Sequence, residues 1–216
     1  TPGNIAIFSF HPIKNITTIE GGMIAVKREE QAERLRMLTN NGMPTAAWSR
    51  YAAESAPAPP EVVRPGFKYH MPDVHAAIGL EQLKRLDSML EARRRLVRLY
   101  QTVLSDIDEI SLPTVIDNVD HAWHLFVIQL KLDKLAKTRD EVAHALRQEN
   151  VGTGIHFYGV HLHEYYRKSL NIRPEDLPNA TAVSQSVLSL PLYPRLTAKN
   201  VRDVVDALKK VLAHVK

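Results

Sequence analysis

Cysteine is absent from the 216 residues of this chain. The absence excludes disulfide bonds and thiolate metal ligands, and it fits a reducing compartment, so we expect a cytoplasmic protein. The sequence also lacks an apolar run long enough to cross a membrane, and we predict no membrane partner. Internal repeats and low-complexity tracts are not visible either.

A strong excess of one charge is lacking as well. Lysine and arginine number 28 against 24 aspartate and glutamate residues, which suits an anionic small substrate or carries no meaning. Nucleic-acid-binding proteins usually show a denser basic patch, so we expect no nucleic-acid partner. The run Arg93-Arg94-Arg95 with Arg98 lies on a predicted amphipathic helix, and we interpret it as the solvated face of that helix.

The remaining composition, 44% hydrophobic and 24% charged, is typical of a globular protein with one large or two small domains. Apolar spacing predicts a helix over residues 29–39 and a long helix that Asp73 caps and that runs on to residue 103. A domain boundary is expected within the long helix, near Asp87. Residues 43–66 are rich in proline, and we predict an extended loop with a function of its own.

Strands and helices alternate in the last part of the sequence, after Pro113. We predict strands over residues 123–132, 151–158 and 188–190. Helices are predicted after a capping box at Thr138, over residues 180–187, and after Thr197 as a cap. This alternation predicts a small α/β domain.

The most informative segment lies near the beginning of the sequence. An apolar strand predicted over residues 5–10 is followed by a short turn that presents Lys14. The pair Gly21-Gly22 permits close backbone approach, and a second apolar strand, residues 23–26, follows. A lysine amine beside apolar surface loses solvation, which favours its neutral and nucleophilic form. Two apolar strands cannot bury both of their faces alone, so we expect this pair to lack its partners.

Residues 8–17, Phe-Ser-Phe-His-Pro-Ile-Lys-Asn-Ile-Thr, resemble the lysine motif of the DegT family of sugar-nucleotide aminotransferases, which use pyridoxal 5'-phosphate (PLP). The spelling is most similar to the branch that aminates UDP-4-amino-4-deoxy-L-arabinose precursors. The motif lies mid-chain in this family, so the resemblance implies the C-terminal half of an α/β, fold-type I aminotransferase. Residues 1–87 would be the C-terminal part of the large mixed-sheet domain that binds PLP, and residues 88–216 the small C-terminal α/β domain.

The resemblance also implies roles for four residues of the motif. Lys14 would bind PLP covalently and then move the proton between substrate carbon and cofactor. Ser9 resembles the hydroxyl that binds the cofactor phosphate, and Asn15 is expected to orient the lysine. His11 either contacts the cofactor or caps the strand end. The implied reaction transfers an amino group from glutamate to a nucleotide-linked 4-keto sugar, in cell-envelope polysaccharide or lipopolysaccharide biosynthesis.

Two later segments resemble blocks that face the substrate and the neighbouring subunit. Residues 64–71 resemble the block that reaches the partner's cofactor phosphate, which implies a homodimer with shared active sites. Lys68 replaces the asparagine of many members and keeps a donor for phosphate. Residues 152–157, with His161, resemble the segment that contacts the sugar nucleotide, and we expect substrate contacts from His156, Tyr158 and His161. Packing of the histidines at a strand end is the alternative. Their spacing matches no common zinc signature, and we predict no metal.

Two other functions stay open. A PLP-dependent sugar dehydratase of the same family would carry histidine at the lysine position, and Lys14 argues against it. A non-catalytic truncated homologue or assembly module would keep the fold without a complete cofactor site. The resemblance places the acid that pairs with the pyridine nitrogen outside this sequence, so we expect the chain alone to be inactive.

Overall fold

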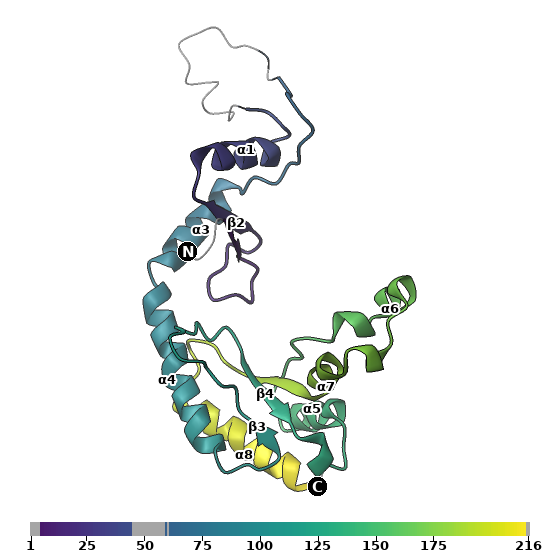
Figure 1. The fold of residues 1–216 in the computed structure, drawn as a ribbon. Coiled ribbons are helices and arrows are strands. Elements are labelled where there is room, and N and C mark those ends of the chain that lie inside the picture. Colours follow the sequence, from purple (N-terminus) through teal and green to yellow (C-terminus); the bar gives the residue numbers. More distant parts are fainter. Residues whose placement is uncertain (1–4, 45–58, 60, 215–216) are drawn as a thin grey trace. The chain divides into compact units, whose positions relative to one another are not determined.

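The computed structural model of the chain describes residues 5–44, 59 and 61–214 (Figure 1). The backbone divides into two compact units, Thr1–Leu86 and Asp87–Lys216, and each is described by itself. Most of the proline-rich loop predicted over residues 43–66 lies outside the described residues.

The first unit contains one pair of strands and two helices among its described residues. Strands β1 (Ile5–Ser9) and β2 (Gly22–Val26) are antiparallel, with Ile5 opposite Val26 and Ser9 opposite Gly22. Helix α1 spans Glu29–Thr39, as predicted. Most apolar side chains of the strand pair are exposed, and Ile7 keeps 78% of its surface. Ala6, Ala25 and Val26 are half-buried.

The long helix that was predicted from Asp73 onward is two helices. Helix α3 spans Asp73–Leu83 and helix α4 spans Leu86–Leu104. The N–H of Arg85 bonds to the carbonyl of Gln82, three residues back, and this tighter turn interrupts the α-helical ladder. Asp73 is not the cap either: it is the first helical residue, and Pro72 occupies the cap position without a side-chain hydrogen bond.

The second unit is built on a three-stranded antiparallel sheet. Its strands β3 (Ile110–Ser111), β4 (Phe126–Leu130) and β5 (Val187–Leu190) lie in the order β3-β4-β5. Besides α4, its longer helices are α5 (Arg139–Gln148), α7 (Pro178–Ser186) and α8 (Ala198–His214). Short helical segments complete the unit: η1 (Leu132–Lys134), η2 (Val160–Leu162), α6 (Glu164–Leu170) and η3 (Pro174–Asp176).

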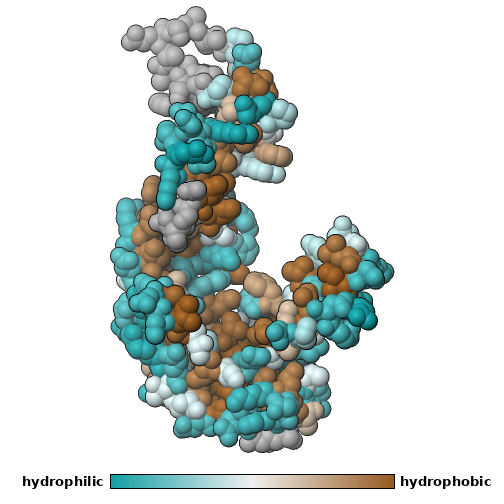
Figure 2. Space-filling view, viewed as in Figure 1, coloured by the Kyte–Doolittle hydropathy of each residue, from teal (hydrophilic) through white to brown (hydrophobic). Residues whose placement is uncertain are grey.

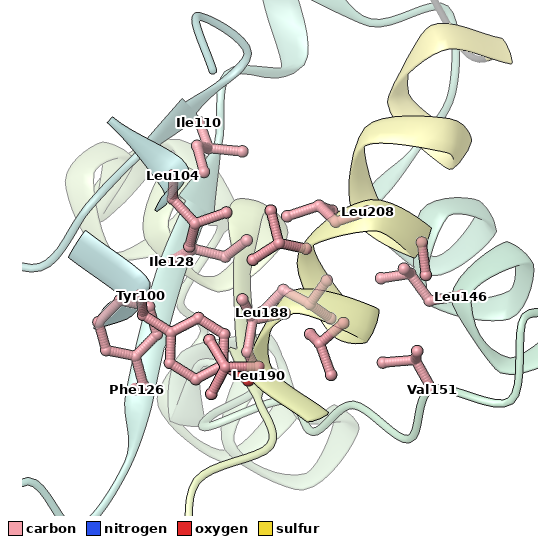
Figure 3. Close-up of a cluster of buried hydrophobic side chains, with 14 of the residues drawn as sticks. Tyr100, Leu104, Ile110, Phe126, Ile128, Leu146, Val151, Leu188, Leu190 and Leu208 are labelled. Atoms are coloured by element: carbon pink, nitrogen blue, oxygen red, sulfur yellow. The ribbon is translucent and has the colours of Figure 1, made fainter. Parts of the chain in front are cut away.

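One cluster of buried side chains joins the sheet of the second unit to α4, α5 and α8 (Figure 3). Tyr100 of α4 stacks on Phe126 of β4 with 4.8 Å between ring centroids. Leu188 and Leu208 are fully buried in the same cluster. Burying each such side chain contributes about 1.5–3 kcal/mol. The Tyr100 hydroxyl donates to the carbonyl of Pro191 at 2.9 Å, and burial raises the pKa of Tyr100 above its usual value.

Two helix starts in this unit are confirmed as predicted. The Thr138 hydroxyl accepts the N–H of Glu141, and the Glu141 carboxylate accepts the N–H of Thr138 at 2.9 Å, which completes a capping box. The Glu141 carboxylate accepts hydrogen bonds from the Thr138 N–H, from Lys137 and from the Thr138 hydroxyl, and these bonds lower the pKa of Glu141 to about 2. At α8 the Thr197 hydroxyl accepts the N–H of Asn200 at 3.2 Å.

Two predicted strands differ from the structure. The strand predicted over residues 123–132 shortens to Phe126–Leu130, because Trp123 has a φ of 44° and Leu132 begins a 3-10 turn. Residues 151–158 form no strand; within this segment Gly154 pairs with Ser189 as an isolated bridge. Elsewhere the boundaries shift by one or two residues, since α7 begins at Pro178, a favoured first helical residue, and β5 begins at Val187.

The interpretation of the arginine run as a solvated face is wrong for Arg93. This residue is only 5% exposed. One of its guanidinium nitrogens donates to the carbonyls of Trp123, His124 and Leu192 at 3.0–3.2 Å. Burial lowers the pKa of Arg93 from its usual value. Arg93 therefore ties α4 to two loops, whereas Arg95 and Arg98 are exposed as predicted.

Among the described residues, no helix is both long enough and apolar enough to span a membrane. Within the same residues, no three histidine or acidic side chains gather where a metal ion could bind.

Candidate active site around Lys14

Lys14 lies on a compact turn directly after β1. The N–H of Lys14 donates to the carbonyl of His11 at 2.9 Å. The imidazole of His11 accepts the N–H of Ile13 through Nδ1 at 3.4 Å, and the N–H of His11 donates to Ser9 Oγ at 3.5 Å. Ser9, His11 and Lys14 therefore belong to one local hydrogen-bonded structure, and His11 caps this turn.

The segment that carries Lys14 is closed at its base. We call residues 10–21 the lysine loop. The carbonyl of Phe10 accepts two hydrogen bonds from the opposite side of the loop. The Thr17 hydroxyl donates at 2.9 Å, and the Thr18 N–H donates at 3.0 Å. The N–H of Phe10 donates to the carbonyl of Gly21 at 2.9 Å. Both ends of the loop are thus fixed, with Lys14 near its middle.

The amine of Lys14 is available for chemistry. The residue is half-buried, and its amine has no ion-pair or hydrogen-bond partner among the described residues. The nearest acid of the loop, Glu20, lies beside His11 instead, with 3.9 Å between Oε1 and Nε2. Ser9 is exposed, and Asn15 is half-buried next to the lysine. An exposed hydroxyl at the end of β1 therefore precedes the turn that carries the free amine.

Other atoms of the chain lie close to the two glycines where the loop meets β2. Gly21 has a φ of 152°, and a Cβ there would lie 2.5 Å from Thr18 Oγ1 and 2.8 Å from Met71 Cε. A Cβ on Gly22 would lie 2.9 Å from the carbonyl oxygen of Phe8. The atoms that come close to this pair belong to the loop, to β1 and to Met71.

Ile19 carries backbone strain within the loop. Its φ is 70°, in the left-handed region that costs a side-chain-bearing residue about 1–2 kcal/mol. β-branched residues adopt this conformation rarely. The strain persists because hydrogen bonds fix the neighbours: the N–H of Ile19 donates to Thr17 Oγ1 at 2.9 Å, and Thr18 Oγ1 donates to the carbonyl of Glu20 at 2.8 Å.

Lys68 lies on a different segment from the lysine loop. Its backbone pairs with Asn40, and its side chain is exposed with no partner among the described residues. The neighbouring N–H groups of Phe67 and Tyr69 donate to carbonyls at the end of α1, at 2.7 and 2.8 Å. The last residue of this block, Met71, reaches the loop at Gly21.

The three predicted substrate contacts lie in the second unit, and their surroundings differ. His156 is half-buried, with Nδ1 2.8 Å from Ser189 Oγ. His161 is 6% exposed, with Nε2 2.8 Å from Thr181 Oγ1. Tyr158 is 48% exposed, and its hydroxyl makes one long hydrogen bond, to the carbonyl of Leu162 at 3.4 Å. The packing alternative fits the two histidines, whereas Tyr158 presents an open aromatic surface.

Sequence reasoning missed the residues of α3 that hold the loop. The N–H of Thr17 donates to Gln82 Oε1 at 3.1 Å, and His75 Nδ1 lies 3.2 Å from the carbonyl of Glu20. These residues are distant from the lysine motif in sequence and match no chemical pattern. The seven-residue step between them on a predicted helix is the one signal that could have pointed to a shared face.

A model of the DegT/DnrJ/EryC1/StrS aminotransferase family matches residues 1–209. The chain therefore belongs to this family, as its sequence predicted. It is 38% identical to Uncharacterized protein MJ1066 of Methanocaldococcus jannaschii over 214 residues, 99% of this chain and 55% of the relative. It is 42% identical to the spore coat polysaccharide biosynthesis protein SpsC of Bacillus subtilis over 211 residues, 97% of this chain and 54% of SpsC. The chain spans about half the length of these curated relatives.

Solved structures show the same partial match. Spr1654 of Streptococcus pneumoniae in its PMP form has a TM-score of 0.87 and 25% identity, over 99% of this chain and 54% of that one. DesV of S. venezuelae, in complex with a ketimine intermediate, has a TM-score of 0.82 and 30% identity, over 98% and 52%. The sugar aminotransferase CalS13 of Micromonospora echinospora has a TM-score of 0.79 at 22% identity, over 96% and 52%, and shows the fold alone. The predicted fold class is confirmed: a mixed α/β fold matching fold-type I sugar aminotransferases over about half their length.

Proposed function

We propose that this chain carries the catalytic lysine of a PLP-dependent aminotransferase that moves an amino group from glutamate to a nucleotide-linked 4-keto sugar. One observation carries the proposal: the half-buried Lys14 amine is free of partners and stands on a loop fixed at both ends. Family membership supports the reaction class, and the similarity to SpsC, a spore coat polysaccharide biosynthesis protein, supports a role in polysaccharide biosynthesis. The absence of cysteine supports a cytoplasmic setting.

Ser9 and the residues of the lysine loop fit PLP. Spr1654 was solved in a PLP form, which supports this cofactor. When bound, PLP supplies an aldehyde carbon that takes up the amino group and a ring that accommodates the electron pair released at the substrate carbon. Lys14 Nζ would hold the aldehyde and, once displaced, move the proton at the amino-bearing carbon. Ser9 would donate its exposed hydroxyl to the phosphate, and Asn15 would orient the lysine.

Lys68 and Tyr158 take the roles that face other molecules. We propose that the exposed ammonium of Lys68 reaches the cofactor phosphate of a second copy in a homodimer with shared active sites; its lack of partners among the described residues supports this. We further propose that Tyr158 contacts the sugar nucleotide directly. His156 and His161 would hold its segment in place through Ser189 and Thr181.

The two alternatives rest on different observations. Lys14 stands at the position where a dehydratase of this family would carry histidine, and this disfavours dehydration. A chain that is inactive by itself is supported by the match to about half of each relative and by the exposed faces of β1 and β2. We therefore assign the reaction to the full family fold and expect the 216-residue chain alone to turn over no substrate.

Reductive trapping tests the cofactor assignment. The chain is mixed with PLP, reduced with sodium borohydride and mapped by mass spectrometry. We expect the pyridoxyl group mainly on Lys14 and its loss in Lys14→Ala, whereas Lys27→Ala, at an exposed lysine after β2, leaves the pattern unchanged. Equal labelling of Lys14 and Lys27 would remove Lys14 from its role. An amination assay over UDP- and dTDP-linked keto sugars, with a protein of full family length, then tests the substrate.

A further inference from the structure

One face of helix α3 contacts the lysine loop at three successive points. His75, Gly79 and Gln82 are spaced four and three residues apart, which places them on the same side of an α-helix. All three are half-buried, whereas Val74, Leu80 and Leu83 of the same helix are exposed. Both the spacing and the burial of these residues therefore identify one face of α3.

The three contacts follow the far side of the loop in order. The N–H of Thr17 donates to Gln82 Oε1 at 3.1 Å. Thr18 is 2% exposed and lies over Gly79, where an added Cβ would stand 2.8 Å from Thr18 Cγ2. The carbonyl of Glu20 accepts a hydrogen bond from His75 Nδ1 at 3.2 Å. The loop thus runs antiparallel to the helix along this face.

Gln82 bonds to the loop at its base. Thr17 is three residues from Lys14, and its hydroxyl donates to the carbonyl of Phe10 on the opposite side of the loop. A half-buried N–H that loses its acceptor makes the local structure less stable. Removal of the Gln82 carbonyl would therefore release the base of the loop from α3 without touching Lys14.

We propose that Gln82 is a positioning residue for Lys14, with Gly79 reserving the space that Thr18 needs. This face of α3 sets where the loop base stands and hence where the amine is presented. The inference rests on the proposed function for its catalytic meaning, whereas the positioning itself is a property of the chain without cofactor.

Hydrogen–deuterium exchange of the 216-residue chain tests the positioning directly. Gln82→Met keeps the side-chain length but has no strong acceptor, and Gln82→Glu keeps an oxygen at the same place. We expect the Thr17 amide to exchange roughly fivefold faster or more in Gln82→Met and close to the wild-type rate in Gln82→Glu. Glu81→Gln, at an exposed neighbour on α3, serves as the matched control and leaves the rate unchanged. A wild-type rate in Gln82→Met overturns the proposal.

A second variant separates loop positioning from helix stability. Alanine favours helix more than glycine does, so Gly79→Ala stabilises α3 intrinsically. Because the new Cβ collides with Thr18, we expect faster exchange at Thr18 and slower or unchanged exchange within α3. Protection of Thr18 that rises together with that of α3 would contradict the role of Gly79.

Labelling with formaldehyde and cyanoborohydride follows the amine itself. In Gln82→Met we expect the labelling rate of half-buried Lys14 to approach that of exposed Lys27, and in Gln82→Glu to stay at the wild-type ratio. An unchanged ratio in Gln82→Met would show that α3 does not position Lys14. Because formaldehyde needs no cofactor site, this result is independent of PLP trapping, whose failure at Lys14 in the wild type would count against the proposed function alone.

Discussion

The interactions that stabilise the first unit internally differ from those that stabilise the second. In the second unit, Phe126, Ile128 and Leu208 are fully excluded from solvent within one apolar cluster. In the described part of the first unit, the buried residues are Thr18 and Gly42, and no hydrophobic side chain is buried. Hydrogen bonds to the backbone fix the base of the lysine loop and join residues 67–69 to the end of α1. Phe67 also stacks on Tyr69, with 4.9 Å between ring centroids.

This difference separates the part that is stable by burial from the part that carries the chemistry. A two-stranded antiparallel pair is marginal in water without further surface to cover it. β1 and β2 leave Ile7, Met23 and Ile24 exposed, and Figure 2 shows hydrophobic residues at the surface of the chain. Each relative contains about as much chain again as this one. We infer that the first unit reaches full stability only when the rest of the family fold covers its strands.

Truncation of one apolar side chain in each unit gives the largest expected contrast. Phe126→Ala removes a fully buried ring and should destabilise the chain by about 3–5 kcal/mol. Ile7→Ala removes a side chain that is already 78% exposed, and its cost should stay below about 0.5 kcal/mol. Urea unfolding followed by far-ultraviolet circular dichroism measures both.

The same pair of variants in a protein of full family length sharpens the comparison. There the cost of Ile7→Ala should rise by more than 1 kcal/mol if further chain covers β1, since a buried isoleucine typically loses about 2–5 kcal/mol on truncation to alanine. The cost of Phe126→Ala should stay the same. An Ile7→Ala cost in the 216-residue chain that equals the Phe126→Ala cost would contradict the distinction between the two units.

Sequence patterns predicted the elements whose signals are local. The apolar spacing of residues 29–39 predicted a helix with the observed ends, and Thr138 with Glu141 marked the start of α5. The errors arose where contacts distant in sequence decide the backbone. Trp123 adopts a positive φ in a loop whose carbonyls bond to Arg93, and the burial of Arg93 could not be read from a run of arginines.

The lysine turn was predictable because its chemistry is concentrated in a few neighbouring residues, Ser9, His11 and Lys14. Its support was not, because Gln82 lies 65 positions from Thr17. The histidines at 156 and 161 show the opposite case. Because they are histidines, the sequence suggested substrate binding. Their hydrogen bonds to Ser189 and Thr181 join residues distant in the sequence and could be found only from the structure.

Helix caps provide a second contrast of intermediate size. Helix α5 has a complete capping box, whereas α1 begins after Arg28 with no side-chain cap. Thr138→Ala should cost about 1 kcal/mol, and Arg28→Ser should stabilise α1 by a similar or smaller amount. Thermal unfolding measures the first change, and exchange rates of the α1 amides measure the second.

The capping box also predicts a pH dependence. The pKa of Glu141 is lowered to about 2 in the folded chain from a usual value of about 4.5. Its contribution to stability is therefore complete above pH 4.5 and disappears as the pH falls through about 2. Wild type should be more stable than Glu141→Gln at pH 6, and the two should converge near pH 2. A difference that grows on acidification would have the wrong sign for this box.

The smallest expected effect compares two isoleucines within the lysine loop. Ile13 and Ile19 are both 52% exposed, but only Ile19 has a positive φ, of 70°. Asparagine tolerates this conformation better than a β-branched residue does. Ile19→Asn should therefore stabilise the loop by about 0.5–1 kcal/mol, which slows amide exchange of residues 17–21 roughly two- to fivefold. Ile13→Asn, the matched control, should slow no amide. Equal responses from both variants would show that side-chain polarity, and not the backbone conformation of Ile19, sets the exchange rates of the loop. Backbone strain at Ile19 would then not limit the stability of this part of the first unit.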